Sequence, residues 1–307
     1  METLYITHPA CRLHEMGNWH PESSQRLDAI NDQLLASGLM PCLVHEQAVP
    51  ATEIDILRVH TPEYLAYLRS KLPKTGYFAI DPDTLMNPYT LEAAWAAAGA
   101  GITAVDAVMK KKARTAFCSV RPPGHHARPA AAMGFCFFNN IAVAAAYALE
   151  KYALNKIAII DFDVHHGNGT EEIFSNDARI LMCSFFQHPL FPNVCQDAPA
   201  ENMVNIPVDA YTKGDTIRQI LSDIWMPRLE AFAPELILIS AGFDAHREDD
   251  MAQLGMVESD YAWITERIMD LAERTAQGRV VSFLEGGYNL SALGRSVVAH
   301  VKALAAL

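Results

Sequence analysis

The chain has 307 residues, of which 50% are hydrophobic and 20% charged, so it can bury a large core and lacks the composition of a disordered protein. Its net charge of −12 argues against general binding to nucleic acid, because phosphate contacts need clustered Lys and Arg. The first residues, METLYITHPA, lack the basic start and apolar centre of a signal peptide. We therefore expect a cytoplasmic protein with no membrane association, folded as one domain over residues 1–307. Whether it forms a homo-oligomer is left open.

Short hydrophobic runs alternate with longer helical patterns along the chain. The runs predict strands at residues 4–7, 115–120, 156–162, 180–184, 203–206, 235–240 and 279–284. The helical patterns cover residues 21–36, 62–71, 90–112, 140–152, 215–231, 259–276 and 291–305, with Ser259 and Ser291 as expected N-caps of the last two. Such alternation predicts an α/β fold, with a mostly parallel central sheet covered by helices on both faces.

The longest apolar run and the cysteines both indicate core structure. Residues 93–105 are too short to cross a bilayer, and their Ala and Gly content predicts a buried helix. The six cysteines show no CxxC spacing, and several lie in apolar runs, which favours reduced thiols in the core. They are Cys11, Cys42, Cys118, Cys136, Cys183 and Cys195.

Four unusual motifs come directly after predicted strands. RPPGHH follows Val120, DFDVHHGNG closes the strand at 156–162, SAGFDA follows Ile239, and EGGYN follows Leu284. Functional residues of parallel sheets gather beyond the carboxyl ends of the strands. We therefore expect these four motifs to meet at one edge of the sheet.

The strongest candidate for a metal site is the D-x-D-x-H pattern of Asp161, Asp163 and His165. In an extended chain these alternate side chains point to one side, and buried carboxylates need a counter-charge such as a divalent metal. The alternative is a solvated acidic turn. Asp244 is the candidate third ligand, although by itself it could equally be a helix N-cap. Two Asp and one His would leave coordination positions open, as in catalytic rather than structural zinc sites.

Candidate acid–base groups are the neighbouring His125 and His126. Imidazole suits proton transfer near neutral pH, and each ring needs an orienting partner, for which Asp161 and Asn168 are available. Tyr288 follows two glycines and could donate a hydrogen bond to a developing oxyanion. Taken alone, it could also be an ordinary turn tyrosine.

Taken together, the motifs resemble the histone deacetylase family, specifically its class II-like and bacterial branch. The matching segments run in the family's order over nearly the whole chain: HPESSQRL, RPPGHHA, GFCFFNNIAVAA, DFDVHHGNGT, SAGFDAH and EGGYN. The resemblance implies a three-layer α/β/α fold of the arginase/deacetylase kind. It also implies a zinc-dependent amidohydrolase that uses metal-activated water to remove acetyl or other acyl groups from lysine side chains or small amines.

The resemblance assigns roles residue by residue. It implies one zinc ion per chain, bound by Asp163, His165 and Asp244, and a catalytic group in which His126 is the general base. The other members of that group are His125, Asp161, Asn168 and Tyr288, the last as the residue that polarises the scissile carbonyl. Gly134, Phe135 and Phe191 match the walls of a narrow channel for the acyl-lysine stem.

The family also binds potassium. The resemblance implies a structural K⁺ near the zinc, bound partly through backbone oxygens of Asp161, Asp163, His165, Ser184 and Phe185. A second monovalent site is implied at Phe174, Asp177, Ile180 and Asn202.

Three alternatives remain beside the lysine deacetylase. A binuclear manganese ureohydrolase would need extra bridging aspartates, and Gly167 stands where one would follow D-V-H-H. An acetylpolyamine amidohydrolase would use the same chemistry on a different amine. A non-catalytic acyl-lysine or metal-binding module is the alternative of another class, and the presence of His125, His126 and Tyr288 argues against it.

Substrate choice is expected to depend on the channel rim. The resemblance implies that polyamine-selective relatives of one branch carry a glutamate at this rim, seven residues after the ligand aspartate, and Met251 holds that position here. A methionine cannot pair with an ammonium group, which favours acyl-lysine. The neighbouring Glu248, Asp249 and Asp250 are expected to form a solvated acidic turn.

Overall fold

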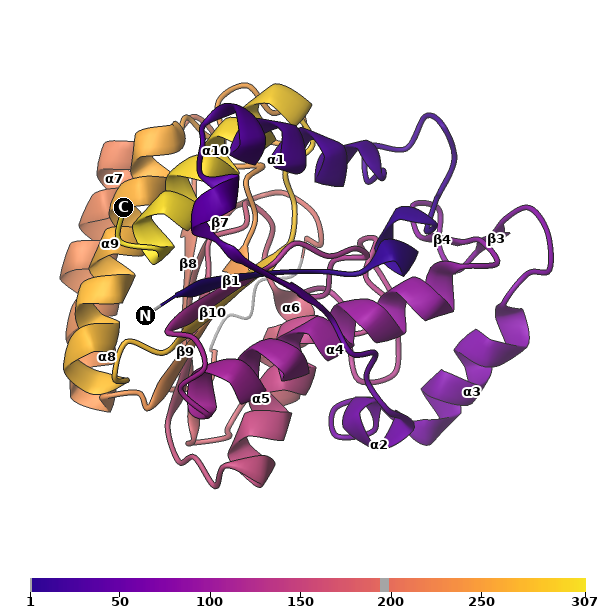
Figure 1. Ribbon diagram of the computed structural model, residues 1–307, viewed down its shortest axis with the longest axis horizontal. Coiled ribbons are helices and arrows are strands. Elements are labelled where there is room, and N and C mark those ends of the chain that lie inside the picture. Colours follow the sequence, from indigo (N-terminus) through magenta and orange to yellow (C-terminus); the bar gives the residue numbers. More distant parts are fainter. Residues whose placement is uncertain (1, 194–198) are drawn as a thin grey trace.

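The computed structural model describes residues 2–193 and 199–307, and its centre is an eight-stranded sheet (Figure 1). The strand order is β2-β1-β5-β10-β9-β6-β7-β8, and every neighbouring pair is parallel. The strands are β1 (Thr3–Thr7), β2 (Val44–Gln47), β5 (Thr115–Cys118), β6 (Ile157–Asp161), β7 (Ile180–Gln187), β8 (Met203–Val208), β9 (Leu236–Ala241) and β10 (Val280–Leu284). A separate antiparallel pair joins β3 (Phe78–Ala79) to β4 (Leu85–Met86).

Helices cover both faces of the sheet, which confirms the predicted three-layer α/β/α fold. Figure 1 shows α1, α9 and α10 on one side and α4 and α5 on the other. The helices are α1 (Gln25–Ala36), α2 (Glu53–Ile56), α3 (Pro62–Lys71), α4 (Thr90–Met109), α5 (Asn140–Lys151), α6 (Asn168–Phe174), α7 (Gly214–Ile220), α8 (Met226–Phe232), α9 (Glu258–Thr275) and α10 (Leu290–Leu304). Short 3₁₀ turns span Pro9–Arg12 and Met40–Cys42.

Several predicted details were wrong for local reasons. The helix expected at 215–231 is divided by a π-helical turn at Leu221–Trp225. β2 was missed because its residues are largely polar and exposed at the sheet edge. The elements α2, α6, β3 and β4 were missed as well, being only two to seven residues long.

The expected N-caps were also wrong. Ser259 and Ser291 lie inside their helices. Asn289 caps α10 by accepting a hydrogen bond from Ala292 N at 3.0 Å, and the Asp260 carboxylate accepts one from Val257 N at 2.9 Å at the start of α9.

The apolar helix and the cysteines follow the core prediction. α4 is long and apolar enough to cross a membrane by length and composition, but 72% of its apolar window is buried inside the protein. The five described cysteines are free thiols, and four of them are buried. Cys42 is the exposed one, and Cys195 lies outside the described residues.

Candidate active site

The four motifs meet at the carboxyl edge of the sheet, as the strand pattern predicts. They follow β5, β6, β9 and β10, which are consecutive strands in the order β5-β10-β9-β6 at the middle of the sheet. A parallel sheet brings the loops after adjacent strands together, so residues far apart in sequence share one site.

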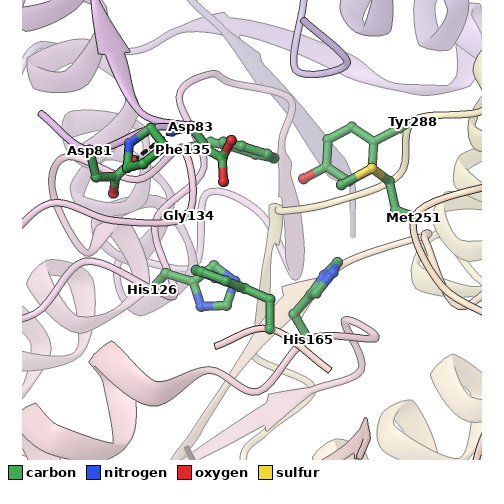
Figure 2. A pocket seen from close by; sticks show the side chains of 10 residues that line it. Asp81, Asp83, His126, Gly134, Phe135, His165, Met251 and Tyr288 are labelled. Carbon is green, nitrogen blue, oxygen red and sulfur yellow. Dashed lines mark hydrogen bonds between the residues drawn. The ribbon is translucent and has the colours of Figure 1, made fainter. Parts of the chain in front are cut away.

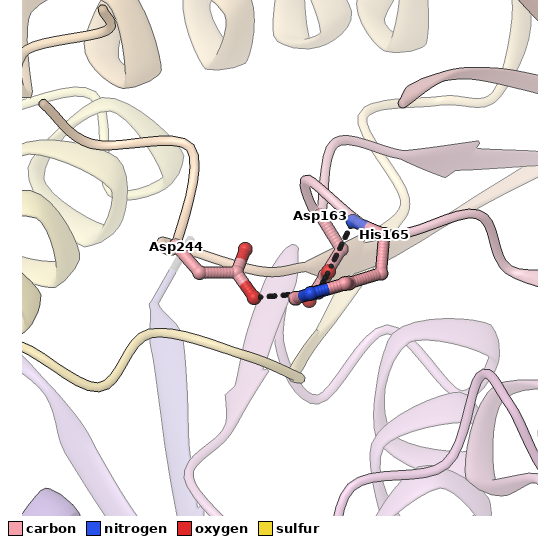
Figure 3. A group of neighbouring side chains, drawn as sticks. All are labelled: Asp163, His165 and Asp244. Atoms are coloured by element: carbon pink, nitrogen blue, oxygen red, sulfur yellow. Dashed lines mark hydrogen bonds and ion pairs between the residues drawn. The ribbon is translucent and has the colours of Figure 1, made fainter. Parts of the chain in front are cut away.

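Asp163, His165 and Asp244 form a buried cluster at this edge (Figure 3). One potential ligand atom from each lies within 4.8 Å of the other two. His165 Nδ1 is 3.1 Å from Asp163 Oδ1 and 3.1 Å from Asp244 Oδ2. Ligand atoms of one zinc ion, each about 2.0–2.2 Å from the metal, are separated by similar distances. Asp244 is therefore placed as a potential ligand, and the structure has no helix directly after it that it could cap.

The surroundings of this cluster fit a divalent cation. Burial and the nearby Asp163 carboxylate raise the pKa of Asp244, so the two carboxylates repel each other unless a positive charge lies between them. Glycines let the backbone approach closely. A Cβ at Gly242 would lie 2.0 Å from Asp163 Oδ2, and one at Gly286 would lie 2.0 Å from Asp244 Oδ2. Two carboxylates and one imidazole are a donor set that zinc accepts.

His125 pairs with a carboxylate. Its Nδ1 donates to Asp161 Oδ2 at 3.0 Å, and both side chains are buried. Burial alone would lower the pKa of His125, but the carboxylates of Asp161 and Asp163 raise it to about 10. His125 is therefore a cation at neutral pH.

His126 pairs instead with an amide. Its Nδ1 lies 2.8 Å from Asn168 Oδ1, and since an amide oxygen can only accept, Nδ1 carries the proton. Burial and the positive charges of His125 and His165 lower the pKa of His126 well below its ordinary value. The ring is thus neutral, with Nε2 as its proton-accepting atom.

A cavity of about 320 Å³ opens at His126 and His165 (Figure 2). Its lining contains every residue expected for the channel, together with His126, His165 and Tyr288; the channel residues are Gly134, Phe135, Phe191 and Met251. In Figure 2, Tyr288 and Met251 lie on the right, whereas Asp81 and Asp83 lie on the left. Asp81, Pro82 and Asp83 also line the cavity, and they are not among the predicted residues because they lie in a polar stretch outside the motifs.

Tyr288 is held from several sides. Its ring makes an edge contact with Phe135 at 5.9 Å between centroids, and the Arg26 guanidinium lies 4.9 Å from its centroid. Burial raises the pKa of the phenol well above its ordinary value, although Arg26 opposes this. The hydroxyl therefore stays protonated at neutral pH and can donate a hydrogen bond.

A second buried cluster supports the loop that carries Tyr288. Glu22 accepts hydrogen bonds from Arg26 Nη1 at 3.0 Å and from Arg121 Nη2 at 2.7 Å, and Arg26 Nε also donates to Gly287 O at 2.7 Å. Glu22 and Arg26 lie in the HPESSQRL segment and Arg121 begins RPPGHHA, but these segments do not by themselves indicate a role for the three residues. The i, i+4 spacing of Glu22 and Arg26 could have indicated a pair, although α1 begins only at Gln25.

The expected solvated acidic turn is only partly solvated. Glu248 and Asp250 are exposed, but Asp249 is 4% exposed and its carboxylate accepts hydrogen bonds from backbone amides. Hydrogen bonds from backbone N–H groups offset the cost of burying the Asp249 carboxylate. The spacing of residues in the sequence does not indicate these contacts.

The residues expected to bind potassium lie beside the metal cluster. The register of β6 and β7 puts Asp161 opposite Ser184, with Phe185 next in β7. At the expected second position, Asn202 Nδ2 itself donates to the carbonyls of Phe174, Asp177 and Ile180.

Comparison with known proteins identifies the family. The family model described as "Histone deacetylase domain" matches residues 20–304. The chain is 38% identical to a probable deacetylase of Archaeoglobus fulgidus, covering 94% of this chain and 82% of that protein. It is 37% identical to a histone deacetylase-like amidohydrolase of Pseudomonas aeruginosa, covering 88% of this chain and 72% of that protein.

A human relative and a solved structure agree with this match. The human polyamine deacetylase HDAC10 is 36% identical over 92% of this chain, which corresponds to 44% of that protein. The crystal structure of the HDA15 HD domain superposes with a TM-score of 0.93 at 32% identity, covering 99% of this chain and 90% of that one. The chain therefore belongs to the histone deacetylase family.

Proposed function

We propose that this protein is a zinc-dependent deacetylase that removes acetyl or other acyl groups from lysine side chains. Its membership of the histone deacetylase family supports a hydrolase of the deacetylase class. The proposal of a zinc-dependent reaction depends on the buried Asp163–His165–Asp244 cluster, whose His165 lines a cavity that His126 and Tyr288 line as well. An ion-binding module would not need these last two side chains in such positions.

Asp163, His165 and Asp244 would hold the zinc ion. When bound, zinc supplies a Lewis acid that makes water more acidic and polarises the carbonyl of the substrate. The walls formed by Gly134 and Phe135 suit the aliphatic stem of an acyl-lysine, because apolar surface there is favourably covered by methylene groups.

The two histidines divide the proton chemistry. Neutral His126 can take a proton from the attacking water at Nε2 and later deliver it to the nitrogen of the departing amine. Cationic His125, fixed by Asp161, stabilises negative charge that develops beside it. The overall reaction consumes one water molecule and yields a carboxylic acid and a free amine.

Tyr288 has the remaining role. Its protonated phenol can donate a hydrogen bond to the oxygen of the scissile carbonyl as negative charge develops there. The edge contact with Phe135 and the Arg26 guanidinium hold the ring in place before substrate binds.

We also propose that a structural K⁺ binds at Asp161, Asp163, His165, Ser184 and Phe185. Residues 1–307 are proposed to form a single catalytic domain that acts in the cytoplasm. The pairing of Asp161 with Ser184 across β6 and β7 supports the K⁺ position.

Acetate release from an acetyl-lysine peptide tests the proposal. We expect turnover by the zinc-loaded enzyme, loss of turnover with a chelator, and recovery when zinc is restored. His126→Ala should lose at least about 10²-fold in kcat, the usual contribution of a general base. Peptide binding without acetate release would instead favour a non-catalytic module.

Acetylpolyamine hydrolysis is the second candidate, favoured by the acidic side chains at the cavity mouth. Asp81 and Asp83 line the cavity, and an acidic rim attracts a polyamine cation. One carboxylate oxygen of Asp81 already accepts hydrogen bonds within its own turn, since Oδ1 accepts from Asp83 N at 2.9 Å and from Thr84 N at 2.7 Å. Met251, also in the lining, cannot form an ion pair.

We therefore expect kcat/KM on acetyl-lysine peptides to exceed that on acetylputrescine or acetylspermidine by about tenfold or more, since a partly buried charge pair is worth roughly 1–3 kcal/mol. Met251→Glu should narrow this gap by improving polyamine turnover. A clear preference of the unmodified enzyme for acetylpolyamines would make the second candidate the better one.

A further inference from the structure

The buried carboxylate of Asp249 joins two loops of the active site. Its Oδ2 accepts hydrogen bonds from Tyr288 N at 2.6 Å and Asn289 N at 2.9 Å, and its Oδ1 accepts one from Met251 N at 3.0 Å. Asp249 lies in the loop that follows β9 and carries Asp244, whereas Tyr288 lies in the loop after β10. One side chain therefore connects the predicted metal loop to the tyrosine loop.

Neighbouring contacts make the connection rigid. The Asn289 side chain donates to Glu248 O at 2.9 Å and also caps α10 through Ala292 N. Hydrogen bonds to a charged acceptor are shorter and roughly twice as strong as neutral ones. The backbone of Tyr288 is thus anchored where its side chain begins, while Phe135 and Arg26 contact the ring.

We propose that Asp249 is a positioning residue that sets where the Tyr288 hydroxyl stands relative to the predicted metal ligands. This inference rests on the proposed function, in which that hydroxyl stabilises the oxyanion. A displacement of about 1 Å in a catalytic group can cost about 10²-fold in rate, so the anchoring of the backbone matters for turnover.

A double-mutant cycle tests the inference, with kcat, KM and zinc content measured for Asp249→Asn, Tyr288→Phe and the double variant. We expect Asp249→Asn to lower kcat by about tenfold to a hundredfold, with KM and zinc content nearly unchanged. In the Tyr288→Phe background the same change should cost less than about threefold, because residues that act through one group are not additive. Asp250→Asn, at the exposed neighbouring aspartate, is the matched control and should behave as the wild type.

The outcomes distinguish the positioning role of Asp249 from the catalytic role of Tyr288. Losses that multiply in the double variant would show that Asp249 does not act through Tyr288. A Tyr288→Phe enzyme with unchanged kcat would instead overturn the role of Tyr288 in the proposed function. If Asp249→Asn does not fold, Asp249→Glu keeps the charge but moves its oxygens, and the same non-additivity is expected.

Backbone carbonyls converge at the position where the family resemblance implies a second monovalent cation. Asn202 Nδ2 donates to Phe174 O at 2.9 Å, Asp177 O at 3.1 Å and Ile180 O at 3.1 Å. Asn202 Oδ1 accepts from Asn176 N at 3.1 Å, which fixes the orientation of the amide. The reverse orientation would turn the amide oxygen toward three carbonyl oxygens and the amide nitrogen toward Asn176 N, so that a donor would face a donor.

We infer that this chain fills its second cation position with its own amide group. The three carbonyls converge on one point, where either a monovalent cation or N–H donors would satisfy them, and the Asn202 amide supplies the donors. The residues therefore do not fit a second potassium ion.

Crystals grown with thallium(I) in place of potassium test this inference, since thallium is located by its anomalous scattering. We expect no thallium among these carbonyls in the wild type and one ion there in Asn202→Ala. Replacing choline chloride by KCl should also raise the melting temperature of Asn202→Ala more than that of the wild type. Thallium at this position in the wild type, or its absence from a folded Asn202→Ala variant, would overturn the inference.

Discussion

Two buried clusters of charged side chains lie near the same edge of the sheet and balance their charges differently. In the first, Glu22 lies between Arg26 and Arg121, and all three are 0% exposed. Burial alone would raise the pKa of Glu22, but the two guanidiniums lower it to about 2. The protein itself supplies the counter-charge in this cluster.

The second cluster has an excess of negative charge. Asp161, Asp163 and Asp244 are all buried within it, and the pKa of Asp244 is raised by burial and by Asp163. His125 and His165 compensate only part of this charge. In the Glu22 cluster, side chains of the protein supply all the positive charge that the buried carboxylate needs, and such a cluster, here called complete, supports the fold. In the aspartate cluster they supply only part of it, and such a cluster, here called incomplete, is suited to bind a cation.

The largest expected effect is in the incomplete cluster. Asp244→Ala should lose the metal and about 10³-fold or more in kcat/KM, because a bound metal contributes several kcal/mol to the transition state. The protein should still fold, because this cluster does not hold the core together. Metal analysis, circular dichroism and acetate release measure the three consequences, and Asp28→Ala at a half-exposed aspartate is the control. An Asp244→Ala enzyme that keeps one tightly bound zinc and its activity would contradict the comparison.

Substitutions in the complete cluster should instead lower the stability of the fold. Arg121→Met breaks the buried ion pair with Glu22 and leaves the carbonyls of Cys11 and His14 without their donor, so it should cost about 3–5 kcal/mol in the free energy of unfolding. Arg12→Met is the matched control, because the Arg12–Asp28 pair is nearly half exposed and worth about 0–1 kcal/mol. Urea denaturation measures both values. Equal values for the two variants would show that the buried Glu22 cluster contributes no more to stability than a half-exposed ion pair.

Tyr288 lies between the clusters and should report on catalysis alone. Tyr288→Phe should retain zinc and substrate binding and lose about 10²–10³-fold in kcat, the usual loss for one oxyanion donor. Steady-state kinetics on an acetyl-lysine peptide measures kcat and KM separately. A normal kcat with a raised KM would make Tyr288 a binding contact only.

The smallest expected effect is a pH dependence of stability in the complete cluster. Because the pKa of Glu22 is about 2 in the folded protein and its ordinary value is 4.5, the unfolded chain takes up this proton first as pH falls. The stability that ionised Glu22 contributes is present above pH 4.5 and is lost as pH falls toward about 2. Between pH 6 and pH 3 the difference in unfolding free energy between the wild type and Glu22→Gln should shrink by about 2 kcal/mol, at 1.36 kcal/mol per pKa unit. A constant difference over this range would show that Glu22 is not held ionised by its arginines.

Much of the fold and the site could be predicted from the sequence, because the strands and motifs carry their own signals. The hydrophobic runs gave the parallel sheet, and the motifs after β5, β6, β9 and β10 gave the residues that the structure brings together. The roles of Asp249 and Asn202 could not be predicted, since both depend on contacts with backbone atoms of distant segments. The type of a residue does not reveal which distant backbone atoms its side chain will contact, and an acidic residue in a polar stretch is usually exposed.

A zinc titration of the metal-free enzyme, with acetate release as the readout, tests the proposed zinc dependence most directly. We expect no turnover without metal, a linear rise as zinc is added, and a plateau at about one equivalent per chain, because Asp163, His165 and Asp244 can form one ligand set. Turnover in the metal-free enzyme, or a plateau at two equivalents, would contradict this expectation.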